Sequence, residues 1–191
     1  MLFVYLLLMQ KATFGGGSFW CTEAIFQTLK GVEKVVSGYM GGELKHPTYM
    51  EISTGETGHA EVIEIEFDEN IISFDDLLLI FFKTHDPTTP NKQGNDIGTQ
   101  YRSVIFYHND SQKQQVEQMI NEFSKQHVFD EPTVTEISPA SDFYEAEDYH
   151  QDYFNHNQSK PYCSFVIQPQ LNQFAIDFKE KIKPELLEYL A

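Results

Sequence analysis

The clearest chemical signal in the sequence is the turn at Gly15 to Gly17, which joins a strand-like apolar run to a segment of helical periodicity. Ser18 follows the three glycines and opens the expected helix. The N–H groups at the start of a helix lack partners within it, and together with the macrodipole they stabilise negative charge. A cysteine there would be favoured as the thiolate, whereas a serine hydroxyl stays protonated without a strong base. Ser18 is therefore interpreted either as an N-cap or as the place of a nucleophile.

The chain has two cysteines, Cys21 and Cys163, and seven histidines. Two cysteines are too few for a disulfide framework and fit a reducing compartment, so the sequence predicts a cytoplasmic protein. His59, His85 and His150 lie in unrelated segments, without a Cys-x-x-Cys motif or a His-Glu-x-x-His run. The sequence therefore predicts no metal site.

Several longer stretches resemble, in the same order along the chain, the motifs of the peptide methionine sulfoxide reductase A family. Residues 15–21, Gly-Gly-Gly-Ser-Phe-Trp-Cys, are similar to that family's Gly-Gly-Gly-Cys-Phe-Trp signature. The further stretches are His46-Pro47-Thr48-Tyr49, Thr57-Gly58-His59-Ala60-Glu61, His85-Asp86-Pro87, residues 93–103 and residues 146–151. Several long motifs in order are specific, where a lone Gly-Gly-Gly would mean nothing. The catalytic cysteine of the family falls on Ser18.

The resemblance implies an acid and two phenols beside position 18. In this chemistry a thiolate attacks the sulfoxide sulfur, and the departing oxygen needs a proton from a carboxyl group of raised pKa. By resemblance the acid is Glu61, the phenols are Tyr49 and Tyr101, and Asp96 orients the group or binds water. Without the motifs, Glu61 would be interpreted as an exposed carboxylate at a strand end and the tyrosines as loop aromatics.

Phe19 and Trp20 follow position 18 directly. An aromatic pair holds a methyl group in apolar surroundings while it leaves the sulfoxide oxygen exposed to donors. The resemblance implies that these two rings form the methyl pocket for methionine sulfoxide. The alternative is that both rings pack into the core, because the helix they open is amphipathic.

Regeneration needs a second thiol, because reduction leaves a sulfenic acid on the attacking cysteine. Cys21 stands at Cys-x-x-Cys spacing from position 18, a geometry that helix N-termini use for redox disulfides. Cys163 lies in the C-terminal region, where members of the family often carry a resolving cysteine. Both remain candidates, with a slight preference for Cys163 in a mobile C-terminal segment. A buried structural thiol is the alternative for each.

The elements that must position these residues are short strands that alternate with amphipathic helices. Strands are predicted at residues 11–14, 32–39, 61–67, 103–107, 133–137 and 165–167. Helices are predicted from Ser18 to Gly31, from Ser73 through Phe81, over 116–123 and over 171–178, with loops at 41–58 and 85–99. This alternation indicates one α/β or α+β domain. With the resemblance, the expectation is a single α+β domain over residues 9–191, a two-layer sandwich with a mixed sheet, flanking helices and a ferredoxin-like core.

Composition is that of one globular domain of 191 residues, with 41% hydrophobic and 14% aromatic residues. The formal net charge of −16 would repel polyanions, so nucleic acid is excluded as an expected partner. Residues 1–8 are an apolar extension that lacks a basic leader and the roughly 20 residues needed to span a bilayer. We therefore expect neither a signal peptide nor a membrane anchor.

The resemblance implies an enzyme that reduces the S epimer of methionine sulfoxide, free or in proteins. It would act as a monomer, need no organic cofactor or metal, and be recycled by thioredoxin. Two origins of Ser18 stay open: a cysteine-to-serine substitution that holds the enzyme before covalent chemistry, and a natural serine paralogue. In both cases the chain as written is expected to be inactive. The alternatives are a protein that binds methionine sulfoxide without reducing it, and a serine hydrolase, for which the Gly-x-Ser-x-Gly turn is missing.

Overall fold

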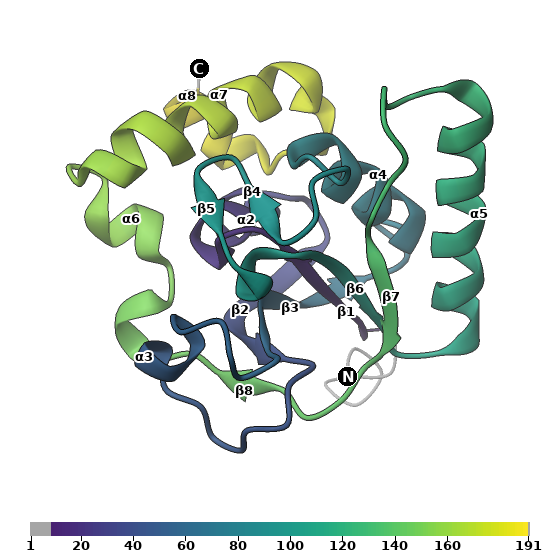
Figure 1. Cartoon of the computed structure of the whole chain (residues 1–191). Coiled ribbons are helices and arrows are strands. Elements are labelled where there is room, and N and C mark those ends of the chain that lie inside the picture. Colours follow the sequence, from purple (N-terminus) through teal and green to yellow (C-terminus); the bar gives the residue numbers. More distant parts are fainter. Residues whose placement is uncertain (1–8, 191) are drawn as a thin grey trace.

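The computed structural model describes residues 9–190. Its centre is a six-stranded sheet in the order β7-β6-β1-β3-β2-β8, accompanied by a two-stranded hairpin of β4 and β5 (Figure 1). The strands are β1 (Met9–Gly16), β2 (Val32–Met40), β3 (Ala60–Asp68), β4 (Lys92–Gln93), β5 (Asp96–Ile97), β6 (Ser103–Tyr107), β7 (Glu136–Pro139) and β8 (Tyr144–Glu145). The predicted extension at residues 1–8 lies outside the described residues.

The helices occupy the stretches between these strands and the C-terminal third of the chain. They are α2 (Phe19–Phe26), α3 (Tyr49–Ile52), α4 (Phe74–Thr84), α5 (Asp110–Gln126), α6 (Tyr153–Asn157), α7 (Gln168–Asp177) and α8 (Leu187–Leu190). Shorter turns include the 3₁₀ helices η1 (Thr99–Tyr101) and η2 (Asp148–His150) and the π-helix η3 (Cys163–Ile167). Within residues 9–190, no helix has the length and apolar character required to cross a membrane.

The core of the fold runs β1, α2, β2, β3, α4, β6 along the chain. Strand β1 pairs antiparallel with β3 and with β6, and β3 also pairs antiparallel with β2. Two interleaved β-α-β units give this order, which is the ferredoxin-like arrangement. Strand β8 adds antiparallel to β2, and β7 adds parallel to β6. The predicted α+β class with a mixed sheet is confirmed.

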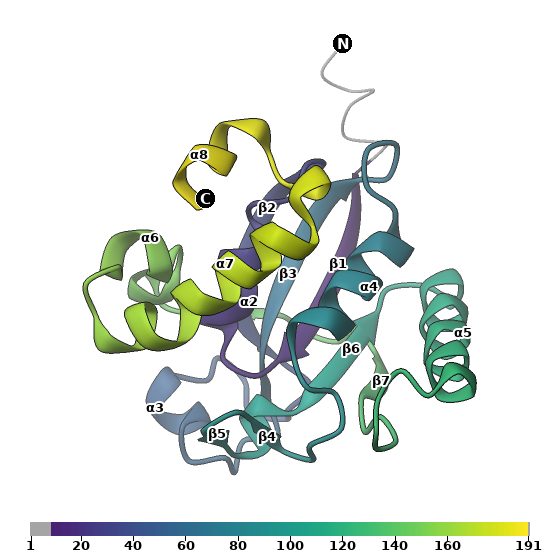
Figure 2. The same ribbon diagram turned by 90° about the horizontal axis from the view of Figure 1, so that it is seen from above.

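The two faces of the sheet are covered differently. Figure 2 shows α2, α4 and α7 on one face, with α5 beside α4. In β3, Ile63 and Ile65 are fully buried in the main core on the face that carries these helices. Val62 belongs to a smaller buried cluster with Met40 and Phe106, as expected for the opposite side of an alternating strand. The same alternation places Glu61 on the face of Ile63, toward α2.

The expected boundaries needed correction in three places. The predicted strand at 165–167 is wrong, because these residues form η3, which continues into α7. Cys163, Ile167, Leu171 and Phe174 are buried at helical spacing, and that burial stabilises a helix. The predicted strand at 133–137 begins later, at Glu136. Helix α2 ends at Phe26, before Gly31.

Candidate active site

Ser18 sits at the junction between β1 and α2, and the backbone before it requires glycine. Gly17 has a φ of +97°, and a Cβ there would lie 2.6 Å from the side chain of Gln93. The turn therefore packs directly against the β4–β5 hairpin. Ser18 is buried at 6% exposure, and its side chain makes no capping hydrogen bond to α2. Ser18 thus occupies the N-cap position of α2, but its hydroxyl does not cap the helix and the side chain is left for other contacts.

Glu61, the predicted acid, lies against the start of the same helix. The backbone N–H of Phe19 donates to Oε2 of Glu61 across 3.1 Å. The side chain is 2% exposed, and burial raises the pKa of Glu61 to about 8, against the lowering effect of this hydrogen bond. The charge of Asp96 raises the pKa further. At neutral pH the carboxyl is mostly protonated, which is the state required of a proton donor.

The two predicted phenols come from separate segments and gather around this carboxyl. Tyr49 opens α3, and Tyr101 ends η1. Both are partly buried, and the pKa of each hydroxyl is raised first by burial and then by the charge of Glu61. Asp96, on β5, contributes to the same rise for both phenols. The structure thus brings the four predicted groups, Glu61, Tyr49, Tyr101 and Asp96, into one electrostatic neighbourhood.

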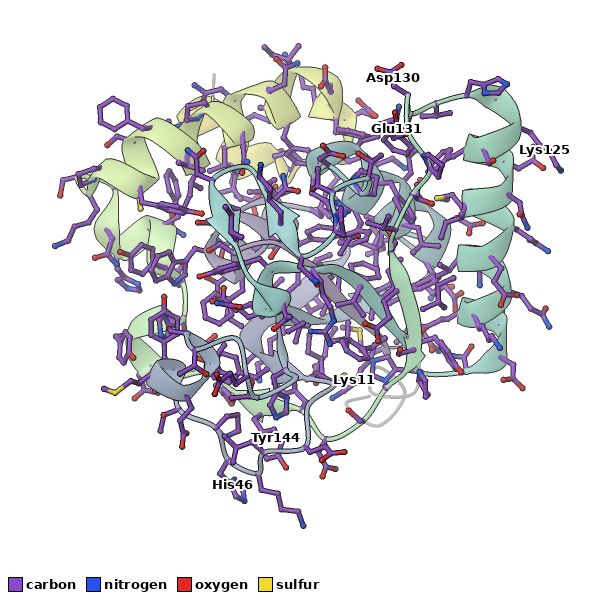
Figure 3. All side chains as sticks on the ribbon, viewed as in Figure 1. Lys11, His46, Lys125, Asp130, Glu131 and Tyr144 are labelled. Carbon is purple, nitrogen blue, oxygen red and sulfur yellow. The ribbon has the colours of Figure 1, made fainter. Side chains whose placement is uncertain are left out.

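Tyr49 is held in place from two sides. Its backbone N–H donates to Oε1 of Glu147 across 2.9 Å. The loop before α3 is anchored by His46, whose ring meets Tyr144 of β8 edge-on at 5.2 Å, and the two side chains lie next to each other in Figure 3. Segments almost 100 residues apart in sequence therefore hold the start of α3, from which the phenol projects.

Of the two aromatic residues after position 18, Phe19 packs into the core and Trp20 lies at the site. Phe19 is 1% exposed and packs against Tyr39 at 5.8 Å between ring centroids, so its ring is part of the core. Trp20 is partly exposed and stacks on Tyr153 at 3.8 Å, with 9° between the ring planes. Its indole N–H donates to Nδ1 of His150 across 3.1 Å. Trp20 therefore has the fixed, partly open ring that a methyl pocket needs.

A cavity of about 340 Å³ opens beside Ser18, between the β4–β5 hairpin and the C-terminal helices. Its walls include Ser18, Cys21, Asp96, Tyr162 and Val166. Phe19, Trp20 and Glu61 are not among its lining residues. The cavity therefore adjoins Ser18 without being lined by the predicted methyl pocket, and Tyr162, one of its walls, separates it from Trp20 at 5.6 Å between ring centroids.

The two thiols differ in their access to position 18. Cys21 lines the cavity with Ser18, and its sulfur lies 3.6 Å from the hydroxyl of Tyr162. Burial raises the pKa of Cys21 to about 12, although Tyr162 lowers it in part. Cys163 is fully buried in the core at the start of η3, and burial raises its pKa too. In this structure Cys163 is helical and packed, so its approach to position 18 requires η3 to open, and the mobility of this segment stays a prediction.

Sequence reasoning gave no role to two residues that complete the site. His150 is 1% exposed, and because its Nδ1 accepts from Trp20, its Nε2 carries the proton; among the described residues Nε2 has no hydrogen-bond partner, and Oε2 of Glu147 lies 3.9 Å from it. Tyr162, the residue before η3, donates to Asp96 of β5 across 2.8 Å. The signals available for them were the stretch at 146–151 and the adjacency to Cys163. Within residues 9–190, no group of three or more His, Cys, Asp or Glu side chains is arranged to hold a metal ion.

Comparison with known proteins gives consistent matches. Residues 10–182 match the family model of peptide methionine sulfoxide reductase. The peptide methionine sulfoxide reductase MsrA of Sulfolobus acidocaldarius is 51% identical over 173 residues, which cover 91% of this chain and 97% of the relative. The reduced form of Mxr1 from Saccharomyces cerevisiae superposes with a TM-score of 0.77 at 32% identity, over 82% of this chain and 90% of Mxr1. Mxr1 in complex with Trx2 matches with a TM-score of 0.56 at 26% identity, over 77% of this chain and 86% of Mxr1.

Proposed function

This chain belongs to the peptide methionine sulfoxide reductase family, and we propose that its site recognises the S epimer of methionine sulfoxide, free or within a protein. The reaction of the family is the reduction of methionine sulfoxide to methionine by a thiol, followed by recycling with thioredoxin. The complex of Mxr1 with Trx2 supports that reductant. The observation that carries the proposal is Glu61, a buried carboxyl of raised pKa bonded to the N–H that follows position 18.

With a cysteine at position 18, the groups around it account for each step. The thiolate attacks the sulfoxide sulfur, and the sulfoxide oxygen takes the proton of Glu61. The S–O bond to the substrate then breaks, the sulfide leaves, and the hydroxyl ends on the cysteine as a sulfenic acid. A second thiol attacks that sulfur and releases water, and the resulting disulfide is reduced by the thioredoxin dithiol. We assign hydrogen bonding of the oxygen to Tyr49 and Tyr101, and positioning to Asp96.

A serine at position 18 prevents the reduction but leaves the groups that bind the sulfoxide in place. A hydroxyl stays protonated at neutral pH unless a strong base is beside it, and oxygen is a weaker nucleophile toward sulfur than a thiolate. No histidine is among the residues that line the cavity with Ser18, which argues against a serine hydrolase. The chain as written therefore binds methionine sulfoxide without reducing it, whether Ser18 is native or introduced.

We further place the protein in a reducing compartment, and specifically the cytoplasm. Both thiols are free, and no pair of cysteines is bridged among the described residues. Cycling by a thiol mechanism needs that redox state, because the resolving thiol must be available each time a sulfenic acid forms. Localisation of the tagged full-length chain tests this assignment.

Binding is tested by titrating the chain as written with the two epimers of N-acetyl-methionine sulfoxide amide, followed by heteronuclear NMR. The S epimer is expected to bind at least about tenfold more tightly than the R epimer, since only one epimer presents both methyl and oxygen correctly. N-acetyl-methionine amide is the matched ligand that lacks the oxygen, and it should bind more weakly. Equal affinity for both epimers would overturn the proposal.

A further inference from the structure

Besides Glu61 of β3, the core holds a buried acidic residue on helix α2, Glu23, to which we assign no part in the sulfoxide chemistry. Its side chain is 2% exposed. Oε1 accepts the backbone N–H of Asp152 at 3.0 Å, and Oε2 accepts that of Tyr153 at 3.2 Å. Asp152 and Tyr153 begin α6, where backbone N–H groups have no partner within the helix. Glu23 therefore caps α6 from a helix about 130 residues earlier in the sequence.

The start of α6 needs this outside partner. Asp152 has φ 50° and ψ 39°, a left-handed conformation that costs free energy for any residue other than glycine. The side chain of Asp152 makes no capping hydrogen bond to the helix it precedes. Burial raises the pKa of Glu23, and the N–H groups of Asp152 and Tyr153 lower it, so these two donors stabilise its charged form. The strained residue and the buried carboxylate thus stabilise each other.

Holding α6 also fixes the aromatic wall of the site. Trp20 lies three residues before Glu23, hence on the same side of α2. The ring of Tyr153, whose N–H Glu23 binds, stacks on Trp20, and His150 binds the indole N–H. Tyr162 meets Trp20 edge-on at 5.6 Å. The indole is therefore enclosed by three side chains of the segment that Glu23 ties to α2.

We propose that Glu23 is a positioning residue: it clamps the start of α6 to α2 and thereby sets the Trp20 ring and the path of the chain toward Cys163. Only its consequence for sulfoxide binding rests on the proposed function, while the clamp itself stands on the geometry. A glutamine at this position keeps one carbonyl acceptor but turns an amide N–H₂ toward the second donor. An aspartate keeps the charge but is one methylene shorter, so it reaches one N–H group.

Trp20 is the single tryptophan of the chain, so its fluorescence reports on the clamp directly. In the chain as written, Glu23→Gln is expected to shift the Trp20 emission to longer wavelength and to increase its quenching by acrylamide. Glu33→Gln is the matched control, since Glu33 is an exposed glutamate of β2 and the charge change is identical. The control should leave both signals unchanged. Identical emission and quenching in Glu23→Gln and the parent would overturn the proposal.

The variant Glu23→Asp and the affinity for the S sulfoxide distinguish a positioning role of Glu23 from a purely structural one. Glu23→Asp should give an emission shift between those of the parent and Glu23→Gln, and it decides the question if the glutamine variant does not fold. A parent-like spectrum in Glu23→Asp together with an unfolded Glu23→Gln would count against the clamp. Affinity for the S sulfoxide should fall about fivefold in Glu23→Gln, the effect of one lost buried hydrogen bond. If the parent binds no sulfoxide, the proposed function fails while the fluorescence result still judges the clamp.

Discussion

The backbone N–H of Phe19 donates to Oε2 of Glu61 across 3.1 Å, which ties the residue after position 18 to the candidate acid. The bond joins the first turn of α2 to β3, a strand of the sheet against which α2 packs. A carboxyl that is both buried and bonded by one N–H has little stabilisation for its charge, so it stays protonated. The hydrogen bond consequently fixes the position of the proton donor, Glu61, relative to position 18.

The raised pKa of Glu61 predicts a pH-dependent cost in stability. The folded-state pKa of about 8 lies above the ordinary value of 4.5, so the folded chain binds more protons than the unfolded one between these values. The contribution of Glu61 to stability therefore falls as pH rises through this window, by up to about 5 kcal/mol, and this contribution is constant above it. Glu61→Gln should be similar to the parent near pH 4 and more stable at pH 8.5, as measured by urea unfolding. A difference in the free energy of unfolding between Glu61→Gln and the parent that does not change with pH would contradict the raised pKa of Glu61.

Once a thiol is present at position 18, the carboxyl of Glu61 also determines how the rate of reduction falls at alkaline pH. In Ser18→Cys, the rate of S-sulfoxide reduction should fall as pH rises through about 8, because Glu61 loses the proton that the oxygen needs. Adding Glu61→Gln should lower the rate by about 10²-fold or more and remove that fall. Single-turnover rates over pH 6 to 10 measure both effects. An unchanged rate in the double variant would remove Glu61 from the mechanism.

The parts of the fold that follow local periodicity could be predicted from the sequence, and the parts that depend on distant contacts could not. The alternation of Ile63, Ile65 and Phe67 predicted β3, and Ser73 with Asp76 forms the capping box that starts α4. The short apolar run at 165–167 fits a strand or a helix equally, and the burial of Cys163 and Leu171 decides for the helix.

The site shows the same division. The motifs indicated Glu61, Tyr49, Tyr101 and Asp96 because they lie in recognisable stretches. The contact between Trp20 and His150 spans 130 residues. The contact between Glu23 and Asp152 spans 129. No local pattern specifies such pairs, since they arise only when the C-terminal segment packs on α2.

The resolving thiol is predicted to be Cys163, although it is buried in this state. Burial raises the pKa of both thiols, that of Cys21 to about 12, so neither is a good nucleophile where it lies and the resolving thiol must first leave its buried place. Cys163 opens a π-helical turn, a rare geometry that is frequent at functional sites, and we predict that this turn opens to bring the thiol to position 18. In the Ser18→Cys background, Cys163→Ser should lose thioredoxin-driven turnover and keep the first turnover. Production of one sulfide per enzyme, measured by chromatography, separates the two steps.

Cys21→Ser is the matched control for this assignment, because it removes the other buried thiol by the same substitution. It should retain thioredoxin-driven turnover in the Ser18→Cys background. Full cycling in Cys163→Ser with loss in Cys21→Ser would show that the Cys-x-x-Cys spacing was the better guide and that η3 does not open.

The most direct test concerns position 18 itself, because every assigned role depends on a thiolate at that point. Reduction of the S sulfoxide with dithiothreitol is measured for the chain as written, for Ser18→Cys and for Ser18→Ala. The chain as written should give no more product than Ser18→Ala, and Ser18→Cys should turn over the S epimer but not the R epimer. Sulfoxide reduction by the chain as written at the rate of Ser18→Cys, or no reduction by Ser18→Cys, would contradict the account.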